Sequence, residues 1–242
     1  FDSHFKNNPE ILKRFKIEAN IYLMLSHPNI VKLKDLILKD GAHLVMDYIE
    51  GMNLEKYINS VTGPIPSEVA IAMIKEIASA IGYAHQKEIP IPGYNGVLHL
   101  DIKPSNMLIS DAGKVMVIDY GISQGTNEDR MQQNVGSLMY MAPEQLNEGT
   151  TLDHRTDIYS LGVLLHQMLT GSTPYSSKKN TKDEIKGKIQ NDTLERLINI
   201  YPHVDSRLQK IIDTATSKNP NKRYQSCEAL INELKVLENE TI

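Results

Sequence analysis

The sequence predicts an α+β protein with two lobes: a small lobe that mixes a helix with strands, and a large lobe that is mainly helical. Two observations lead to this prediction. The first 49 residues contain one helical and two strand patterns, and Glu50-Gly51 then interrupts the pattern like a hinge. Most of the apolar segments that follow have helical spacing. We therefore divide the chain into residues 1–49, which form the small lobe, and residues 50–242, which form the large lobe.

The small lobe is expected to begin with a helix. Asn8-Pro9-Glu10 supplies an N-cap amide, a proline at the first helical position and an acid near the positive end of the helix dipole. Apolar residues then recur at helical spacing, at Ile11, Phe15, Tyr22 and Leu25. Glu18 lies on the same stripe, where a carboxylate requires a partner. Two strands, Ile30–Leu38 and His43–Ile49, are predicted around a turn that contains glycine.

The large lobe is expected to begin with a long helix that Ser67 caps. Its apolar face consists of Ala70, Ile74, Ile77, Ile81 and Ala84. Strands Met107–Ile109 and Val115–Ile118 flank Asp111-Ala112-Gly113, a hairpin turn signal. Residues 120–150 are polar and irregular, which indicates a long functional loop. Four helices are predicted after it, over residues 156–170, 183–199, 205–216 and 226–238.

The composition excludes several classes of protein. The net charge of −4 gives no reason to expect nucleic acid or an anionic membrane as a partner. No stretch approaches the ~20 consecutive apolar residues that span a bilayer. We therefore expect no membrane segment in this sequence and a cytoplasmic location, either alone or as the cytoplasmic part of a larger or tethered protein. The single cysteine, Cys227, rules out an internal disulfide and a four-cysteine metal site, and we expect it to be a small buried residue of the last helix.

The chemistry-bearing residues gather around the predicted hairpin. The segment 99–106, His-Leu-Asp-Ile-Lys-Pro-Ser-Asn, precedes its first strand, and Asp119 follows its second. Together these segments hold a carboxylate that can orient a hydroxyl, a cation for a transferred phosphate, and oxygen ligands for Mg²⁺. Each residue alone would more often be an ordinary loop residue. The set at this spacing favours phosphoryl transfer.

Five segments, in order, resemble the motifs of eukaryotic-like serine/threonine protein kinases. Residues 99–106 resemble the catalytic loop, and residues 119–121, Asp-Tyr-Gly, resemble the magnesium-binding Asp-Phe-Gly motif with tyrosine for phenylalanine. Residues 136–144 resemble the end of the activation segment, with its Ala-Pro-Glu. Residues 157–162 resemble the start of the large central helix, and residues 219–224 resemble the segment that carries a structural arginine.

This resemblance implies a site that uses ATP and Mg²⁺. Asp101 would orient or deprotonate the substrate hydroxyl, and Lys103 would support the γ-phosphate. Asn106 would act in the same loop and, with Asp119, would hold the metal. The resemblance further implies that Asp157 braces the catalytic-loop backbone, that Glu144 pairs with Arg223, and that His99 supports the motif that follows it.

The resemblance also implies a nucleotide site between the lobes. Glu18 matches the helix glutamate that pairs with a small-lobe lysine. Met46 would lie at the back of the adenine pocket, the backbones of Asp47 and Ile49 would meet the edge of adenine, and Leu108 would lie under its ring. A stacked spine would link the lobes through Tyr22, Leu33, His99 and Tyr120.

The sequence departs from the family in three respects, one of which is a Pro90–Gly96 loop that is longer than expected. It contains no Gly-x-Gly-x-x-Gly and no lysine strand before the first helix, so the small lobe is truncated as given, and we expect the parent protein to continue upstream. In addition, Leu100 replaces the arginine that usually precedes the catalytic aspartate and receives an activation-segment phosphate. Ser123 and Thr126 remain candidate modification sites, but they would lack that partner.

Lys103-Pro104-Ser105-Asn106 resembles the serine/threonine rather than the tyrosine kinase pattern. Ser137 matches the position where the family often has a threonine that bonds both Asp101 and Lys103, and the resemblance implies that its hydroxyl could do the same. The predicted function is transfer of the ATP γ-phosphate to serine or threonine hydroxyls of protein substrates. Small-molecule kinases lack the Ala-Pro-Glu segment and its paired arginine. The stronger alternative is a pseudokinase, a binding scaffold without transfer activity. The composition, rich in Asn, Lys and Ile, favours a bacterial member.

Overall fold

The structure is a computed structural model that describes residues 9–39, 43–90, 96–120, 135–147, 149–175, 180–200 and 204–239. Its helices are α1 (Pro9–Leu23), α2 (Leu54–Tyr57), α3 (Ser67–His85), α5 (Val135–Leu138), α6 (His154–Thr170), α7 (Lys182–Asn191), α8 (Leu197–Ile200), α9 (Ser206–Ala215) and α10 (Cys227–Asn239). Short helical turns are η2 (Ile58–Thr62), η3 (Pro104–Asn106), η4 (Pro143–Leu146) and η5 (Pro220–Lys222). The strands are β1 (Leu33–Ile37), β2 (His43–Met46), β3 (Gly51–Asn53), β4 (Met107–Ser110) and β5 (Val115–Val117).

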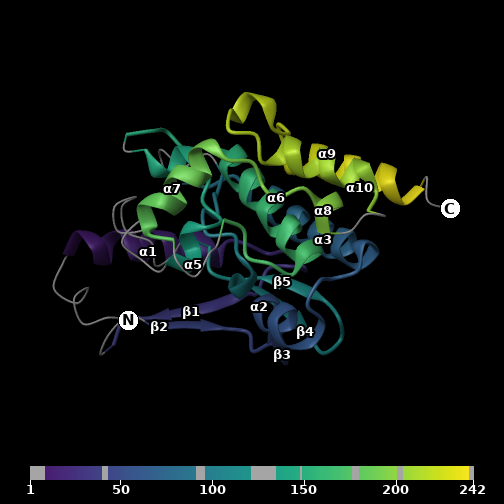
Figure 1. Cartoon of the computed structure of the whole chain (residues 1–242). Helices are drawn as coiled ribbons and strands as arrows, with labels where there is room; N and C mark the ends of the chain where they lie inside the picture. Colours follow the sequence, from purple (N-terminus) through teal and green to yellow (C-terminus); the bar gives the residue numbers. More distant parts are fainter. Residues whose placement is uncertain are drawn as a thin grey trace.

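The strands form two small antiparallel sheets along one edge of the molecule, at the bottom of Figure 1. One sheet pairs β1 with β2, and the other has the order β3–β4–β5. Helices α3, α6, α9 and α10 form the body above them (Figure 1). The expected α+β class, with a helix-and-strand part followed by a mainly helical part, is confirmed for the described residues.

The β1–β2 hairpin is shorter than the sequence indicated. Ile30 lies before β1 and forms an isolated parallel bridge with Val117 of β5. Val31 N–H donates to Val117 O at 3.0 Å, and Val117 N–H donates to Asn29 O at 2.8 Å. Residues 29–31 are therefore paired with β5, whereas Lys32, directly before β1, still accepts a hydrogen bond from Asp47 N–H directly after β2. These bonds tie the front of the chain to the hairpin that carries the chemistry.

Gly51 is the first residue of strand β3, whereas the sequence pattern indicated a hinge there. Its φ of 146° is unfavourable for other residues, and a Cβ placed there would lie 2.0 Å from Ile109 O on β4. Glycine therefore allows β3 to approach β4 in the register Gly51↔Ser110. The hinge-like interruption read from the sequence is the start of a third strand.

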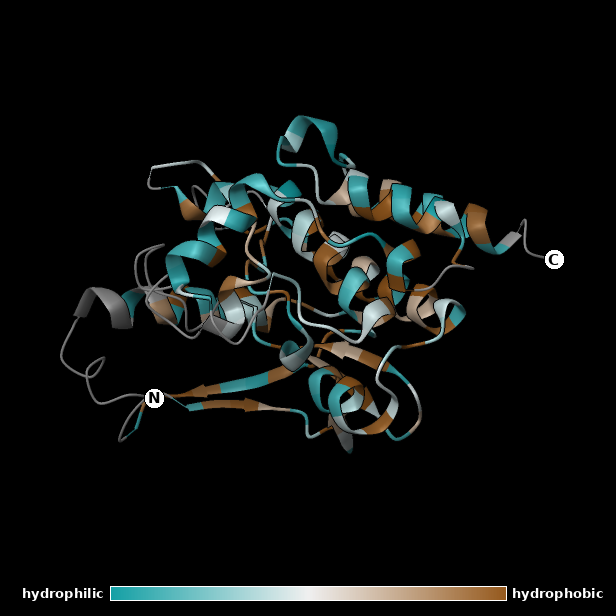
Figure 2. Cartoon of the chain, in the orientation of Figure 1, coloured by the Kyte–Doolittle hydropathy of each residue, from teal (hydrophilic) through white to brown (hydrophobic). Residues whose placement is uncertain are grey.

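The central helix of the body is α6. All of its residues from Thr156 to Thr170 are buried, as is usual for a helix enclosed by others. Helices α3 and α9 pack against α6, and α10 packs against α3 and α9 (Figure 1). The predicted apolar residues of α3 are all buried. Figure 2 shows apolar residues running through this group of helices, with hydrophilic residues on the outer helices.

Two predicted helix boundaries are wrong. The long helix expected over residues 183–199 is two helices, because α7 ends at Asn191 and α8 begins at Leu197. In addition, Pro66 occupies the N-cap position of α3, so Ser67 is its first helical residue and makes no capping bond. Among the described residues, no helix is long and apolar enough to cross a membrane.

Candidate active site

The catalytic loop is held by a buried carboxylate from the start of α6. Asp157 accepts hydrogen bonds from His99 N–H at 2.8 Å and Leu100 N–H at 2.7 Å. His85, at the end of α3, contacts the same carboxylate at 2.8 Å. Burial opposes the charge on Asp157, but the hydrogen bonds from His85 and from the backbone outweigh burial and lower the pKa of the carboxyl group. The predicted brace of the loop backbone is confirmed.

Asp101, Lys103 and Asn106 form one hydrogen-bonded cluster. Lys103 Nζ lies 2.7 Å from Asp101 Oδ2, and Asn106 Nδ2 donates to the same oxygen at 3.0 Å and to Asp101 O at 2.9 Å. Lys103 Nζ also donates to Ser137 Oγ at 2.7 Å. The Lys103 ammonium group and the Asn106 amide therefore both fix the orientation of the Asp101 carboxylate.

His99 links the catalytic loop to the segment that carries Asp119. Asp101 N–H donates to His99 Nδ1 at 3.3 Å, so this nitrogen carries no proton. The opposite nitrogen, Nε2, can then donate to Ile118 O at 3.0 Å. The ring is completely buried and connects the residues before Asp101 with the residue before Asp119. The predicted supporting role of His99 is confirmed.

Asp119 and Asn106 offer oxygen atoms of the type that Mg²⁺ prefers. The amide nitrogen of Asn106 is committed to Asp101, which leaves its amide oxygen for a cation. Although Asp119 is an exposed residue, desolvation around its carboxyl group raises the pKa, and the like charge of Asp101 adds to this rise. A bound cation would stabilise the charged carboxylate, so the donor set fits Mg²⁺. The described residues contain no cluster of three or more His, Cys, Asp or Glu side chains that could hold a metal by itself.

A stack of rings connects α1 with the catalytic loop. The ring of Tyr120 lies 4.8 Å from His99 and 5.6 Å from Tyr22, measured between ring centroids. These three side chains and Leu33 are buried, as the predicted spine requires. The hydroxyl group that distinguishes Tyr120 from phenylalanine donates to Ala80 O of α3 at 3.2 Å. Tyrosine is therefore accommodated by a hydrogen bond inside the large lobe.

The residues predicted to bind nucleotide come from several elements. Glu18 is half-buried on α1, Met46 ends β2 and Leu108 is half-buried on β4. Asp47 N–H donates to Lys32 O at 3.0 Å, which leaves the Asp47 carbonyl outside the backbone pairing. Ile49 follows in the segment between β2 and β3, half-buried and outside both sheets. Their contact with adenine stays a prediction.

Arg223 and Glu144 form the predicted ion pair. Arg223 Nη1 and Nη2 lie 2.6 and 2.8 Å from the two carboxylate oxygens, and the arginine side chain is fully buried. This two-point contact is strong and directional. It ties η4 to the segment after α9 and is confirmed as structural rather than solvated.

The comparisons with known proteins agree with this geometry. Residues 3–234 match the protein kinase domain family. The chain belongs to this family. It is 36% identical over 234 residues to a probable serine/threonine-protein kinase of Clostridium perfringens, and 34% identical over 235 residues to the serine/threonine-protein kinase PrkC of Bacillus subtilis. These alignments cover 95% and 96% of this chain but 32% and 34% of the relatives. The kinase domain therefore spans about a third of the length of the curated relatives it matches.

Two side chains that support the site of this kinase domain were not predicted from the sequence, and one predicted hydrogen bond is absent from the described residues. His85 and Gln145 both contact the catalytic-loop framework, but they are 72 and 45 residues away from their partners, and no local pattern identifies them. Ser137 contacts Lys103 as expected, yet among the described residues it makes no hydrogen bond with Asp101. Ser123 and Thr126 lie outside the described residues.

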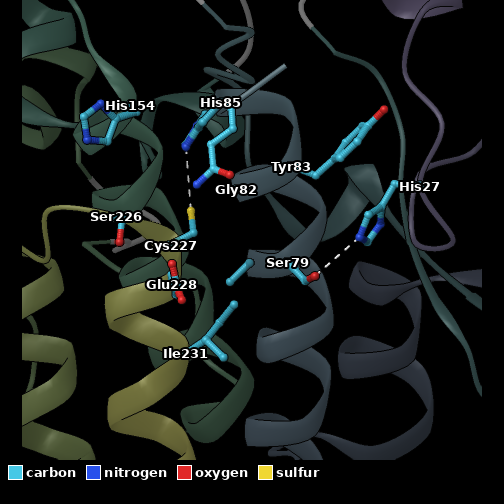
Figure 3. Close-up of a pocket in the computed structure, with 12 residues that line it drawn as sticks. His27, Ser79, Gly82, Tyr83, His85, His154, Ser226, Cys227, Glu228 and Ile231 are labelled. Atoms are coloured by element: carbon cyan, nitrogen blue, oxygen red, sulfur yellow. Dashed lines mark hydrogen bonds between the residues drawn. The ribbon is translucent and has the colours of Figure 1, made fainter. Parts of the chain in front are cut away.

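A cavity of about 570 Å³ lies between α3 and α10. Figure 3 shows His85 and Cys227 facing each other in this cavity, and their Nδ1 and Sγ atoms are 3.8 Å apart. Cys227 is buried in α10, as predicted, and burial raises the pKa of its thiol. The thiol is therefore protonated at neutral pH and serves as a packing residue.

Proposed function

We propose that the protein that contains this kinase domain transfers the γ-phosphate of ATP to serine or threonine hydroxyls of protein substrates. The observation that carries the proposal is the cluster of Asp101, Lys103 and Asn106. In it the Lys103 ammonium group and the Asn106 amide both donate to the Asp101 carboxylate and orient it. The names of the relatives, serine/threonine-protein kinases, support the choice of acceptor. The sequence Lys103-Pro104-Ser105-Asn106 supports the same choice.

Asp101 acts on the acceptor hydroxyl. Its Oδ2 atom is fixed by Lys103 and Asn106, so the carboxylate can accept the hydroxyl proton without first reorganising. Lys103 is held between Asp101 and Ser137, where its charge favours the negative charge that develops on the transferred phosphoryl group. Both side chains are partly buried, which strengthens these interactions relative to water.

Asn106 and Asp119 would hold Mg²⁺, and Met46, Asp47, Ile49 and Leu108 would surround the adenine of ATP. Mg²⁺ held there would supply positive charge that offsets the negative charge of the phosphates. Glu18 would orient the small-lobe lysine. We place the boundary between the small and large lobes at residues 49 and 50, so the nucleotide would bind where the two meet. Because ATP is the donor, we place the domain in the cytoplasm.

The test is phosphate transfer by the full-length protein from labelled ATP to a serine- and threonine-containing protein. Asp101→Asn should lower kcat by about three to four orders of magnitude, because it removes the proton acceptor from the reacting hydroxyl. Calorimetric affinity for Mg-ATP should change little. The matched control is Asp111→Asn, since Asp111 is an exposed aspartate in the β4–β5 turn.

Equal rates for Asp101→Asn and the unmodified protein would contradict the proposed role. The alternative, a pseudokinase, would be favoured by a different result: binding of Mg-ATP by the unmodified full-length protein with no transfer to any hydroxyl. The two outcomes are distinguishable because binding and transfer are measured separately.

A further inference from the structure

Leu100, the residue before the catalytic aspartate, has an unusual backbone. Its φ is 62°, in the left-handed region that residues with a Cβ rarely adopt. Such a conformation persists only when the surroundings determine it. Leu100 N–H donates to Asp157 Oδ1 at 2.7 Å, which fixes one side of this residue. The other side, the carbonyl, belongs to the peptide bond that leads into Asp101.

Gln145 holds that carbonyl. Its Nε2 atom donates to Leu100 O at 3.2 Å, and its Oε1 atom accepts from Ala142 N–H at 2.8 Å. Because one partner only accepts and the other only donates, the amide can have just one orientation. The side chain is 3% exposed, so water does not compete for either bond.

The element that carries Gln145 is itself fixed. Gln145 lies on η4, directly after Glu144, whose carboxylate is bound by the fully buried Arg223 and by Thr156 Oγ1 at 3.0 Å. Because this turn is held in place, the Gln145 side chain can hold the Leu100 carbonyl in a fixed position. Leu100 is thus held on both sides by buried side chains, Asp157 at its N–H and Gln145 at its carbonyl.

We propose that Gln145 is a positioning residue for Asp101, which acts through the Leu100 carbonyl. The Gln145 amide aligns the peptide group that precedes Asp101. It thereby links the anchored η4 turn to the catalytic loop, and this link needs no phosphate on the activation segment. Leu100 offers no side-chain donor for a phosphate, and the Gln145 bond supplies a permanent connection in its place. This inference rests on the proposed transfer of phosphate by Asp101.

The experiment uses two variants of the full-length protein that have nearly the shape of glutamine. Gln145→Met removes both hydrogen bonds and should lower kcat about tenfold or more, with KM for ATP within about twofold, because an unaligned carboxylate affects the chemical step. Gln145→Glu can donate to Leu100 O only when the carboxyl group is protonated. Its kcat relative to that of the unmodified protein should therefore be highest at pH 5.5 and fall as the pH rises to 8.5.

The matched control is Gln209→Met. Gln209 is 6% exposed and uses the same pattern of bonds, since Oε1 accepts from Leu197 N–H at 2.7 Å and Nε2 donates to Asp213 at 2.7 Å. It lies on α9, away from the catalytic loop. Both methionine variants should lose a similar amount of thermal stability, and only Gln145→Met should lose kcat.

The proposal is overturned if Gln145→Met retains the kcat of the unmodified protein, or if the relative kcat of Gln145→Glu does not depend on pH. If Gln145→Met does not fold, Gln145→Glu decides alone, because its protonated form can make both bonds. An inactive unmodified protein would instead contradict the proposed function.

Discussion

Arg223 shows how one residue connects several segments of this domain. Besides its two contacts with Glu144, its Nε atom donates to Ser217 O at 2.7 Å and Nη1 donates to Arg155 O at 2.9 Å. Its guanidinium carbon lies 5.0 Å from the centre of the Tyr159 ring. The charge is therefore satisfied on every side although the side chain is fully buried. Removing such a partner leaves the remaining charge buried and unpaired.

We expect Arg223→Met to destabilise the domain by about 3–5 kcal/mol, because the largely buried Glu144, whose side chain is 12% exposed, would lose its hydrogen-bonded counter-ion. The control is Arg207→Met, which removes an arginine from the ion pair with Asp205, where both side chains are more than a third exposed. That change should cost about 0–1 kcal/mol. Urea unfolding of the three proteins measures both values, and equal losses would contradict the assignment of Arg223 as the main anchor of η4.

At the scale of elements, the sequence pattern predicted those features that depend on residues close together in the chain. The α3 face, the β4–β5 hairpin and the grouping of residues 101–106 depend on short spacings. The structure confirms these elements and shows Asp101, Lys103 and Asn106 hydrogen-bonded to one another, while their catalytic roles stay a prediction. The bond between Gln145 and Leu100 depends on how η4 and the catalytic loop meet in space. The residues next to Gln145 and Leu100 in the sequence give no signal for this long-range contact.

The break between α7 and α8 could have been predicted from the same spacing rule. Ile185 and Ile189 are buried on one face of α7. Continuing that face would place polar residues inward, at Asp192, Thr193 and Arg196. The next buried residues, Leu194 and Leu197, lie off this stripe, so one straight helix could not bury both pairs. The chain leaves the helix after Asn191 and begins α8 at Leu197.

Gly51 of strand β3 allows a test of how closely the β3 backbone approaches the β4 backbone. Gly51→Ala should destabilise the domain by several kcal/mol, roughly 2–4, because the new Cβ would collide with Ile109 O and the φ of 146° suits only glycine. Gly113→Ala is the control: its φ is 78°, but a Cβ there has nothing within 4 Å, so only ~1 kcal/mol of backbone strain is expected. Chemical denaturation measures the difference, and similar losses would show that the β3–β4 contact is not tight.

At the scale of the whole molecule, α6 is the common support. Its first turn holds the catalytic loop through Asp157, and its Thr156 contacts Glu144. Ser160 Oγ donates to Tyr140 O at 2.8 Å, which fixes the segment after Ser137. The catalytic loop, η4 and Tyr140 are therefore all held by one buried helix, and the site geometry depends on the stability of the large lobe.

Lys218 makes that stability depend on pH. Its Nζ atom donates to Ile189 O of α7 at 2.6 Å and lies 5.6 and 5.4 Å from the ring centres of Tyr159 and Tyr175. Desolvation by burial lowers the pKa of Lys218 from 10.5 to about 8, and the charge of Arg223 adds to this effect. In the unfolded chain the lysine keeps its proton up to its ordinary pKa. Between these two values the unfolded state binds more protons, so the free energy of unfolding contributed by this group rises with pH.

We therefore expect Lys218 to give the free energy of unfolding of this domain a positive slope between pH 8 and about 9 that Lys218→Met removes. Above about pH 9 this slope is opposed and then reversed, because burial raises the pKa of Cys227 and of Tyr159, and the unfolded chain loses thiol and then tyrosine protons that the folded state keeps. Lys210→Met, which removes an exposed lysine of α9, controls for the loss of one positive charge. Urea unfolding at half-unit steps of pH measures the slopes. An identical slope in the Lys218→Met protein would show that Lys218 keeps its proton in the folded domain, held by Ile189 O and the two rings strongly enough to overcome desolvation.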